Sequence, residues 1–535
     1  MQKPHKFGKT LIYQTNVYQK EDIMQAFSVE ESIMEGEKEV KELFEFVKDN
    51  AWECDAYEIE KSIFSRVMKI GLSAMKCYFA EKGTGDKGPQ LELKDAPVLQ
   101  LESTLRGRDY FSVFGKLKVP RSCYRTEGQE GIMPLDAEAN LPQRSYSYLL
   151  QQWMDLLSIR DSFGESEITL QELLGLTVSQ SRFEVVSHET KSHYDEFYHN
   201  KETPSAESEG EIEVLGFDGI GVPMIKKEAA KIQARLGKGE KRQKKKEAMV
   251  GVSYTVNSKE RTAEEVAESL VYPEKARDKK SEKKDAEKVR AQNIRRFASL
   301  ERSRQEVIEE IVKDAKKRDP AQKRPWVVVM DGALNLWKLV FIVLGNLNFV
   351  GILDIIHVVE YLWVAANALY DEKAPERKKW VYEHLLSLLQ GRVGRVIGGL
   401  KQTLRKRKLK VSQRKALKDV IRYFENHREW MRYDEYLSKG YPIGSGVVES
   451  SCGHTVKDRM EGTGRRWSVE GAESVLLLRS IYTSGDWDMY WDSYMKIERK
   501  RVYGKVLDTL NLSEESSNVE QVEESIQPSE EALAA

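Results

Sequence analysis

Three short apolar runs, each leading into an aspartate, constrain the fold of this 535-residue chain most strongly. They read LGFDG, VVVMDG and ILDIIH and end on Asp218, Asp331 and Asp354. The runs are rich in β-branched residues and are too short for helices, so we expect them to form buried central strands. Helical patterns separate them along the chain. The sequence therefore predicts an α/β fold built on a parallel or mixed sheet.

The length exceeds what one hydrophobic core normally serves, and at about 150 residues per domain it predicts three or four units. We expect a helical unit over residues 1–82, a small β unit over 90–140 and a helix-turn-helix unit over 146–200. A core over 210–357, a helical insertion over 358–440 and a final helix over 441–500 follow. Residues 513–535 hold seven Glu and no Lys or Arg, which predicts a disordered acidic tail.

Two stretches carry more specific expectations about secondary structure. Residues 283–317 are highly charged and predict one long helix that ends near Pro320. The helical region from 358 to about 439 contains Gly391, Gly394, Gly398 and Gly399, and we expect these glycines to break it into separate helices.

The cysteines and the apolar segments exclude several protein classes. The four cysteines include no CxxC pair, so we expect neither a disulfide framework nor a zinc ribbon, and a reducing cytoplasm fits. The N-terminus lacks the apolar core of a secretory signal. The most apolar stretch, 339–369, is interrupted by Asp354, His357 and Glu360, so we expect no membrane span.

A helix-turn-helix pattern precedes the first of the aspartate strands. The turn falls at Gly175, and the second helix is expected to begin after Ser179. Gln180, Ser181 and Arg182 would then open a recognition helix, where base and phosphate contacts are made. Two packed helices of a bundle are an equally good interpretation of the same pattern.

The overall charge is balanced, with 85 Lys and Arg against 86 Asp and Glu, but two runs are strongly basic. Residues 226–246 hold ten basic residues and two Glu, and residues 401–415 hold eight basic residues and no acid. Solvated surface explains most such runs, whereas a pair of them favours contact with nucleic acid phosphates. The residues that we expect to contact DNA are Lys241, Arg242, Lys244, Lys245, Lys246, Arg405, Lys406, Arg407 and Lys408.

The carboxylates at the strand ends predict a site for hard divalent cations. Mg²⁺ takes oxygen ligands, and carboxylates from separate elements provide them in phosphoryl-transfer sites. Glu449, at the start of a later helix, adds a fourth carboxylate to Asp218, Asp331 and Asp354. Each also has an ordinary explanation, because Asp-Gly is foremost a turn signal and Glu449 could cap its helix. His357 either supports this site or contacts DNA, or it is simply a residue of the following helix.

Several longer segments resemble one family. The segments FDGIGVPM, RLGKGEKRQKKKEAMVGVSYT, VVVMDGALNLW and GILDIIHVVEYLW resemble bacterial insertion-sequence transposases of the ISKra group, which belong to the DDE class. The block MRYDEYLSKGYPIGSGVVESSCGHTVKDRMEGTGRRWSVEGAESVLLLRSI carries the strongest resemblance. The similarity covers about residues 140–495 and implies an RNase H-like core.

The resemblance assigns roles to individual residues. It implies that Asp218, Asp331 and Glu449 are the catalytic, metal-binding carboxylates, with Mg²⁺ or Mn²⁺ as the cofactor. Asp354 and His357 resemble the Cys/Asp-x-x-His element of related transposases and are secondary candidates. The implied activity is cleavage at the ends of a mobile element and joining of the 3′-hydroxyl ends to target DNA.

The implied partners are the terminal inverted repeats and target DNA, with a homo-oligomer forming on the DNA in the bacterial cytoplasm, associated with the nucleoid. Two alternatives remain: a domesticated or inactive DNA-binding relative, and an RNase H-like nuclease without strand transfer.

One departure from the family concerns the β unit. Relatives often carry a Cys-rich knuckle there, whereas this chain keeps only Cys123, so we expect no zinc site. DNA contacts in this unit would have to come from Arg106, Arg108, Arg121 and Arg125.

Overall fold

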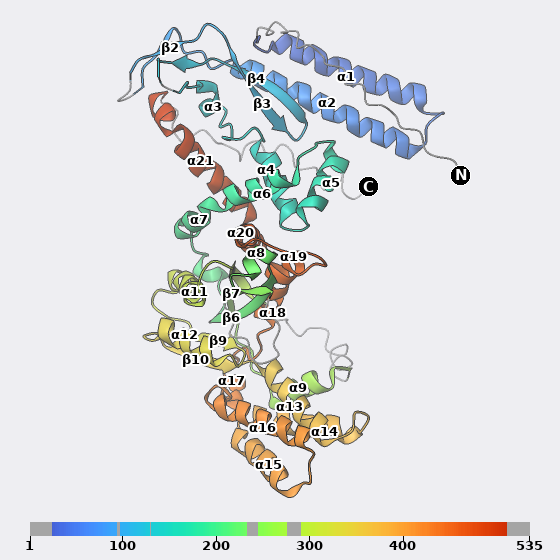
Figure 1. Ribbon diagram of the computed structural model, residues 1–535, viewed down its shortest axis with the longest axis vertical. Coiled ribbons are helices and arrows are strands. Elements are labelled where there is room, and N and C mark those ends of the chain that lie inside the picture. The colour runs from blue at the N-terminus through green and yellow to red at the C-terminus, as the bar shows by residue number, and fades with distance from the viewer. Residues whose placement is uncertain (1–23, 94–96, 129, 233–243, 275–289, 511–535) are drawn as a thin grey trace, which may run out of the picture. The chain divides into compact units, whose positions relative to one another are not determined.

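The computed structural model describes residues 24–93, 97–128, 130–232, 244–274 and 290–510. These residues form two compact units (Figure 1). One comprises residues 1–151 together with 496–535, and the other comprises residues 152–495. The predicted acidic tail lies outside the described residues. Among the described helices, none has a stretch long and apolar enough to cross a membrane.

The first unit begins with two long helices that pack side by side. They are α1 (Val29–Asn50) and α2 (Ala56–Lys82). Ser28 and Asp55 cap their N-termini by accepting backbone N–H bonds, and Gly83 ends α2 with a positive φ of 69°. The helices expected in this region are therefore confirmed. Phe79 of α2 is buried in a small core with Tyr110, Leu117 and Leu135.

The strands of the first unit form two small sheets. The elements are β1 (Gln90–Leu91), β2 (Leu99–Leu101), β3 (Arg106–Ser112), β4 (Gly115–Arg121), β5 (Tyr124–Arg125) and α3 (Pro134–Glu138). Strands β3 and β4 form an antiparallel hairpin, and β1, β2 and β5 form the second sheet. Gly115 starts β4 with φ of 134°, a conformation that glycine adopts without strain.

A group of helices follows along the chain. They are α4 (Tyr148–Ser158), α5 (Phe163–Leu174), α6 (Gln180–Thr190) and α7 (Tyr194–Asn200), with short 3₁₀ turns at Lys191–His193 and Ala206–Ser208. Gly175 ends α5 in the left-handed conformation, and Ser179 precedes α6 in an extended one. The predicted helix, turn and second helix are thus present, and α6 packs against α5 and α20.

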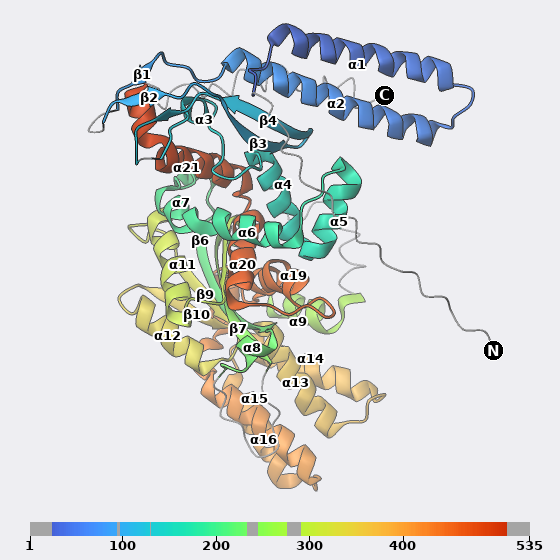
Figure 2. The ribbon, with the colours of Figure 1, turned by 45° about the horizontal axis from the view of Figure 1, so that its top comes forward.

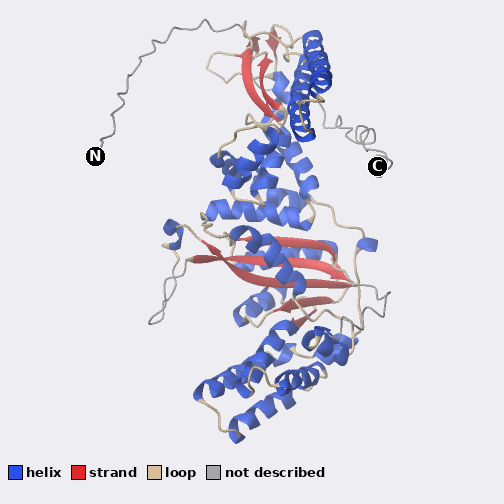
Figure 3. Cartoon of the chain, turned by 90° about the vertical axis from the view of Figure 1, so that its right-hand side faces the viewer, coloured by secondary structure: helices blue, strands red, loops and turns tan. Residues whose placement is uncertain are grey.

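The second unit is built on a five-stranded mixed sheet (Figure 3). Its strands are β6 (Ile212–Pro223), β7 (Lys245–Val256), β8 (Gln292–Ser299), β9 (Trp326–Met330) and β10 (Phe349–Leu353). Their order across the sheet is β10-β9-β6-β7-β8. Strand β7 runs antiparallel to β6 and β8, whereas β9 and β10 run parallel to β6. The α/β class predicted from the aspartate-ended strands is confirmed.

Strand β8 corrects the prediction of one long helix over 283–317. The described part of that segment holds β8 and then α11 (Arg304–Arg318), which Ser303 caps. Strand β8 is charged yet largely buried, because its arginines have partners in the fold. The guanidinium of Arg295 lies over the ring of Tyr198 and donates to the Tyr194 hydroxyl, and Arg296 donates to Ser451.

Helices cover the sheet, and the insertion supports its β10 edge. Helix α11 packs on β7, and α20 (Val469–Ser484) packs on β8. The remaining short helices of the sheet region are α8 (Lys226–Ala229), α9 (Ala263–Val271) and α12 (Leu334–Leu344). Strand β10 is an edge strand rather than a central one. The hydroxyls of Tyr433 and Tyr436 donate to its carbonyls at Leu353 and Gly351, which protects part of this edge.

The chain between β10 and the last part of the second unit is helical (Figure 2). Its helices are α13 (Ile355–Leu369), α14 (Pro375–Leu389), α15 (Val393–Lys406), α16 (Val411–Asn426) and α17 (Tyr433–Ser438), with a 3₁₀ turn at Arg428–Trp430. Gly391 lies in the turn between α14 and α15 with φ of 73°. Gly394, Gly398 and Gly399 do not break the chain as predicted, because they lie inside α15.

The segment 441–500 holds several helices rather than one final helix. They are α18 (Gly446–Ser451), a π-helical turn at Cys452–Lys457, α19 (Asp458–Met460), α20 and α21 (Trp487–Thr509). A π-helical turn widens the helix locally and is frequent at functional sites.

Candidate functional site

Strand register places the three predicted aspartates level with one another. Leu215 of β6 lies opposite Val328 of β9, so continuing this register brings Asp218 level with Asp331. Leu353 of β10 lies opposite Met330, and the N–H of Asp354 donates to the Met330 carbonyl at 2.8 Å. Strand β6 continues past Asp218 to Pro223, so this residue lies within its strand rather than at its end, which corrects the prediction.

Asp218 is partly buried and faces two different neighbours. Its Oδ1 accepts the backbone N–H of Gly219 at 2.7 Å, and the Cys452 thiol donates to its Oδ2 at 3.5 Å. Burial, and then the negative charge of Asp331, raise the pKa of the Asp218 carboxyl, against the opposing effect of its hydrogen bonds. A cation bound beside Asp218 would favour the ionised form of its carboxyl.

The helical insertion fixes the loop that carries Asp331. A Cβ added at Gly332 would lie 2.4 Å from a ring carbon of Tyr423 on α16, so only glycine fits this position. The Nε2 atom of His427 lies 2.9 Å from the Gly332 carbonyl oxygen. The Asp331 Oδ1 accepts the N–H of Ala333 at 3.0 Å, and the Asp331 carbonyl accepts the Trp337 indole N–H at 2.7 Å. The backbone at Asp331 is therefore held from both sides.

Two contacts position Glu449 on α18. Val448 packs directly on β6 at Gly216, where an added Cβ would lie 2.2 Å from Val448 Cγ2. The loop before α18 is tied to Asp354, because the Ser445 hydroxyl donates to Asp354 Oδ2 at 2.6 Å and the Ser445 N–H donates to Oδ1 at 3.2 Å. Glu449 itself is exposed.

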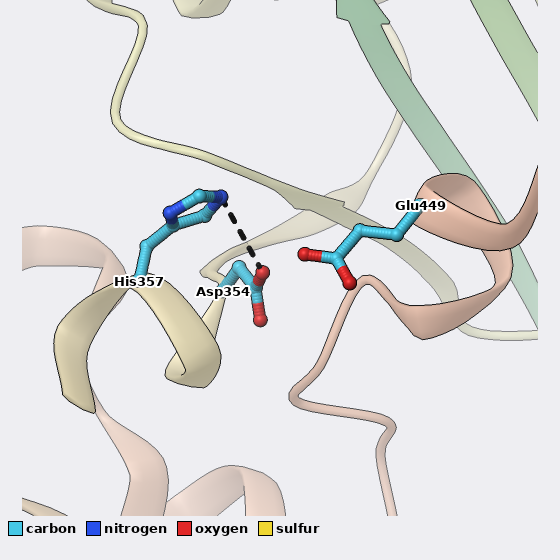
Figure 4. A group of neighbouring side chains, drawn as sticks. All are labelled: Asp354, His357 and Glu449. Carbon is cyan, nitrogen blue, oxygen red and sulfur yellow. Dashed lines mark ion pairs between the residues drawn. The ribbon is translucent and has the colours of Figure 1, made fainter. Parts of the chain in front are cut away.

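One group of potential metal ligands stands out among the described residues. Ligand atoms of Asp354, His357 and Glu449 all lie within 4.8 Å of one another (Figure 4). Of the three residues assigned as catalytic from the sequence, only Glu449 belongs to this group. Asp218 and Asp331 lie outside it.

The geometry of Asp354 is that of a supporting residue. Its side chain has no exposed surface and accepts hydrogen bonds from Ile356 N–H, Ser445 N–H and the Ser445 hydroxyl. It therefore caps α13 and anchors the loop that leads to Glu449. These bonds occupy both of its oxygens, which leaves less capacity for a metal than at Asp331.

His357 is an ion-pairing residue in this group. Its Nδ1 lies 3.0 Å from Glu360 Oε2, and its Nε2 lies 3.9 Å from Asp354 Oδ2. Burial alone would lower the pKa of His357, but the hydrogen bond to Glu360 and the charges of Asp354, Glu360 and Asp331 outweigh it and raise the pKa. Because Glu360 engages Nδ1, Nε2 is the ring nitrogen that faces Asp354.

Sequence reasoning missed two residues of this site. The spacing of Cys452 predicts no metal site, yet its buried thiol contacts Asp218, and burial with the Asp218 charge raises the pKa of the thiol. Ser445 lies in the GSG segment, but nothing in that pattern indicates a bond to Asp354, 91 residues earlier.

The candidate DNA-contacting residues fall into three groups. Gln180, Ser181 and Arg182 occupy the exposed first turn of α6. The second group lies at the start of β7, where Lys245 already forms an ion pair with Glu461 at 2.7 Å. Lys244 is exposed and Lys246 is half-buried, whereas Lys241 and Arg242 lie outside the described residues. The third group is exposed at and after the end of α15 and comprises Arg405, Lys406, Arg407 and Lys408.

The arginines of the β unit, which the sequence offers for DNA contact, form ion pairs with acidic residues of the same unit. Arg108 and Arg121 both pair with the buried Asp136, at 3.0 and 2.5 Å, and both are largely buried at their side chains. Arg106 and Arg125 lie 2.7 and 3.9 Å from Glu102. These four residues are therefore engaged in ion pairs within the β unit.

Comparison with known proteins gives no relative: no protein-family model matches the chain, and no curated protein matches it.

Proposed function

We propose that the chain is a DDE transposase with an RNase H-like core, which cuts DNA at the ends of a mobile element and joins the 3′-hydroxyl ends to target DNA. The observation that supports this most strongly is the level placement of Asp218, within β6, and Asp331, directly after the parallel strand β9, with α18 packed on β6 at Gly216. The strand order also supports it, because a five-stranded sheet with only β7 reversed is the arrangement expected of such a core.

Asp218, Asp331 and Glu449 are the residues that would hold Mg²⁺ or Mn²⁺. Their oxygen atoms suit hard cations, and the raised pKa of Asp218 beside Asp331 is consistent with carboxylates placed to share a positive charge. When bound, the metal would activate the attacking water or hydroxyl and stabilise the leaving oxygen. Asp354 acts through Ser445 to orient the loop before Glu449 and is a positioning residue.

The remaining residues would bind DNA. Exposed side chains that open a helix can read base edges, which supports Gln180, Ser181 and Arg182 as the residues that recognise the terminal repeats. The basic residues after α15 and at the start of β7 would contact phosphates without sequence preference. The proposal places a homo-oligomer on bacterial DNA in the cytoplasm, associated with the nucleoid.

The test uses the full chain, Mg²⁺, a supercoiled plasmid, and a linear duplex with the DNA that flanks the gene and a free 3′-hydroxyl. We expect a joined product that disappears in the Asp331→Asn variant. Cleavage without joining would favour the nuclease alternative, and a mobility shift without cleavage would favour the DNA-binding alternative. Either result, or the absence of both binding and cleavage, would overturn the proposal.

A further inference from the structure

Helices α1 and α2 contact each other through a surface that is poor in apolar residues. Glu35 pairs with Lys76 at 2.7 Å, and Glu39 pairs with Lys69 at 3.9 Å. Arg66 lies over the Phe46 ring at 4.8 Å. These pairings run in opposite directions along the two sequences, so the helices are antiparallel. The only buried α1 residues are Ser32 and Leu43.

A second set of residues forms an apolar stripe on each helix. On α1 the stripe comprises Ile33, Val40 and Phe44, which are 47%, 38% and 67% exposed. On α2 it comprises Val67, which is 46% exposed, with Ile70, which is half-buried. Spacings of three, four and seven residues place the members of each stripe on one face of their helix.

The two stripes lie on the same side of the helix pair. Each residue of the two stripes directly follows a residue that faces the other helix. On α1 the inward-facing residues are Ser32, Glu39 and Leu43. On α2 they are Arg66 and Lys69. One step turns a right-handed helix by 100°. Because α1 and α2 are antiparallel, this equal step turns both stripes toward one side. We call this surface, formed by Ile33, Val40, Phe44, Val67 and Ile70, the hairpin face.

The small sheets of the first unit do not cover the hairpin face. The part of α2 that packs on them uses Leu72, Met75 and Phe79, which lie on a different side of the helix. The turn between β3 and β4 also packs on Gly71, where an added Cβ would lie 2.4 Å from Phe114, so it reaches the edge of the hairpin face but leaves Val67 46% exposed. Figures 1 and 2 show β3 and β4 next to one end of α2, with α1 and the rest of α2 extending beyond them. A helix pair with an apolar side that the described residues leave exposed normally packs against further helices.

We propose that the hairpin face is the contact between two copies of this chain, in which the two helix pairs form a four-helix bundle. Charge supports a second copy as the occupant. Helix α1 has eight acidic and three basic residues, whereas α2 has five basic and three acidic residues. A two-fold axis that lies in the plane of the face and runs parallel to the helices lays each α1 over the partner's α2, which brings helices of opposite net charge together.

Such a contact also requires area beyond the apolar stripes themselves. A stable interface buries about 800 Å² per copy, and uncovered apolar patches on monomers are typically below about 600 Å². On α1 the hairpin face extends over residues 33–44, about 18 Å, and on α2 over residues 67–70, about 6 Å, so flanking polar side chains of both helices complete the contact around an apolar centre. This inference does not depend on the proposed function.

The test is the oligomeric state of the full chain without DNA, measured by sedimentation equilibrium between 1 and 50 µM, a range chosen on the order of typical weak-dimer dissociation constants. We expect a dimer for the wild-type chain, and a rise in the dissociation constant of about 100-fold or more for a Phe44→Glu, Val67→Glu variant. Met34→Glu is a matched control, because Met34 is also on α1 and also 67% exposed but lies one step further around the helix.

Two outcomes would overturn the proposal. The first is a wild-type chain that stays monomeric over the whole range. The second is a Phe44→Glu, Val67→Glu variant that stays as dimeric as the wild type, which would place the contact elsewhere. In the first case, a Tm that falls in that variant but not in Met34→Glu would show that the face packs within its own chain. Circular dichroism of each variant checks that the helices persist.

Discussion

The contact between Val448 and Gly216 gives a prediction whose size follows from the structure. A Cβ at position 216 would lie 2.2 Å from Val448 Cγ2, whereas ordinary contact begins at 3.4 Å. The Gly216→Ala variant must therefore open this contact by about 1 Å. Valine has one strongly preferred χ1 rotamer in a helix, so the side chain does not turn away and α18 moves with it.

We expect two effects of Gly216→Ala. Overpacking of this kind lowers the free energy of unfolding by about 1 to 3 kcal/mol. Because Glu449 follows Val448 on α18, a shift of about 1 Å also displaces its carboxylate, and a misplacement of that size reduces a reaction rate by about 100-fold. DNA binding should change little, since Gly216 is buried.

A double-mutant cycle tests whether the contact between residues 216 and 448 causes both effects. Val448→Ala removes the two methyl groups of a buried side chain, one of which would clash, at a cost of about 1.5 kcal/mol. Gly216→Ala should add little in that background, which gives a coupling energy of about 1 kcal/mol or more. Gly398→Ala is the control, because an added Cβ there meets nothing within 4 Å and lies inside α15. It should raise the free energy of unfolding by up to about 1 kcal/mol.

Urea denaturation and metal-dependent nicking of supercoiled DNA measure these effects. The reasoning fails if Gly216→Ala matches the wild type in both assays, or if the losses of Gly216→Ala and Val448→Ala simply add.

Three further predictions concern other contacts. Ser445→Ala removes a hydrogen bond to the buried Asp354 carboxylate and should lower the free energy of unfolding by about 2 kcal/mol in urea denaturation; an unchanged midpoint would contradict this. Burial raises the pKa of the Glu213 carboxyl to about 8 in the folded protein. Because this carboxyl ionises from about pH 4.5 in the unfolded chain, the free energy of unfolding of the wild type falls as the pH rises from 4.5 to 8. The Tm of Glu213→Gln should therefore increase relative to the Tm of the wild type across that pH range. A difference in Tm between the two proteins that does not change with pH would refute this prediction. The double variant Gln180→Ala, Arg182→Ala should lose its preference for element ends in competition binding but keep weak binding to random DNA. If the variant keeps that preference, α6 only packs against its neighbouring helices and does not read the DNA sequence.

The strands and helices of the core could largely be predicted from local pattern. The apolar runs before Asp218, Asp331 and Asp354 form β6, β9 and β10 as expected, because a short β-branched run has few alternatives. Strand β8 was missed because Arg295 and Arg296 suggest an exposed helix. Their burial depends on aromatic and hydroxyl partners that lie far away in the sequence, which no local pattern reveals.

The same reason limits what the sequence indicates about the site. The residue types at Asp218, Asp331 and Glu449 suggest metal chemistry, but whether a carboxylate binds a ligand or a neighbouring loop depends on its tertiary contacts. Asp354 illustrates this, since its partner Ser445 lies beyond the entire helical insertion. Sequence pattern left Asp354 as a candidate metal ligand, and its hydrogen bonds favour a supporting role.

The most direct test of the central proposal is where a divalent cation binds. Crystals of the full chain soaked in Mn²⁺ and measured at the manganese absorption edge would locate the ion by its anomalous scattering. The account predicts an anomalous peak shared by the carboxylates of Asp218 and Asp331. A peak confined to Asp354, His357 and Glu449, or no peak beside Asp218 and Asp331, would contradict it.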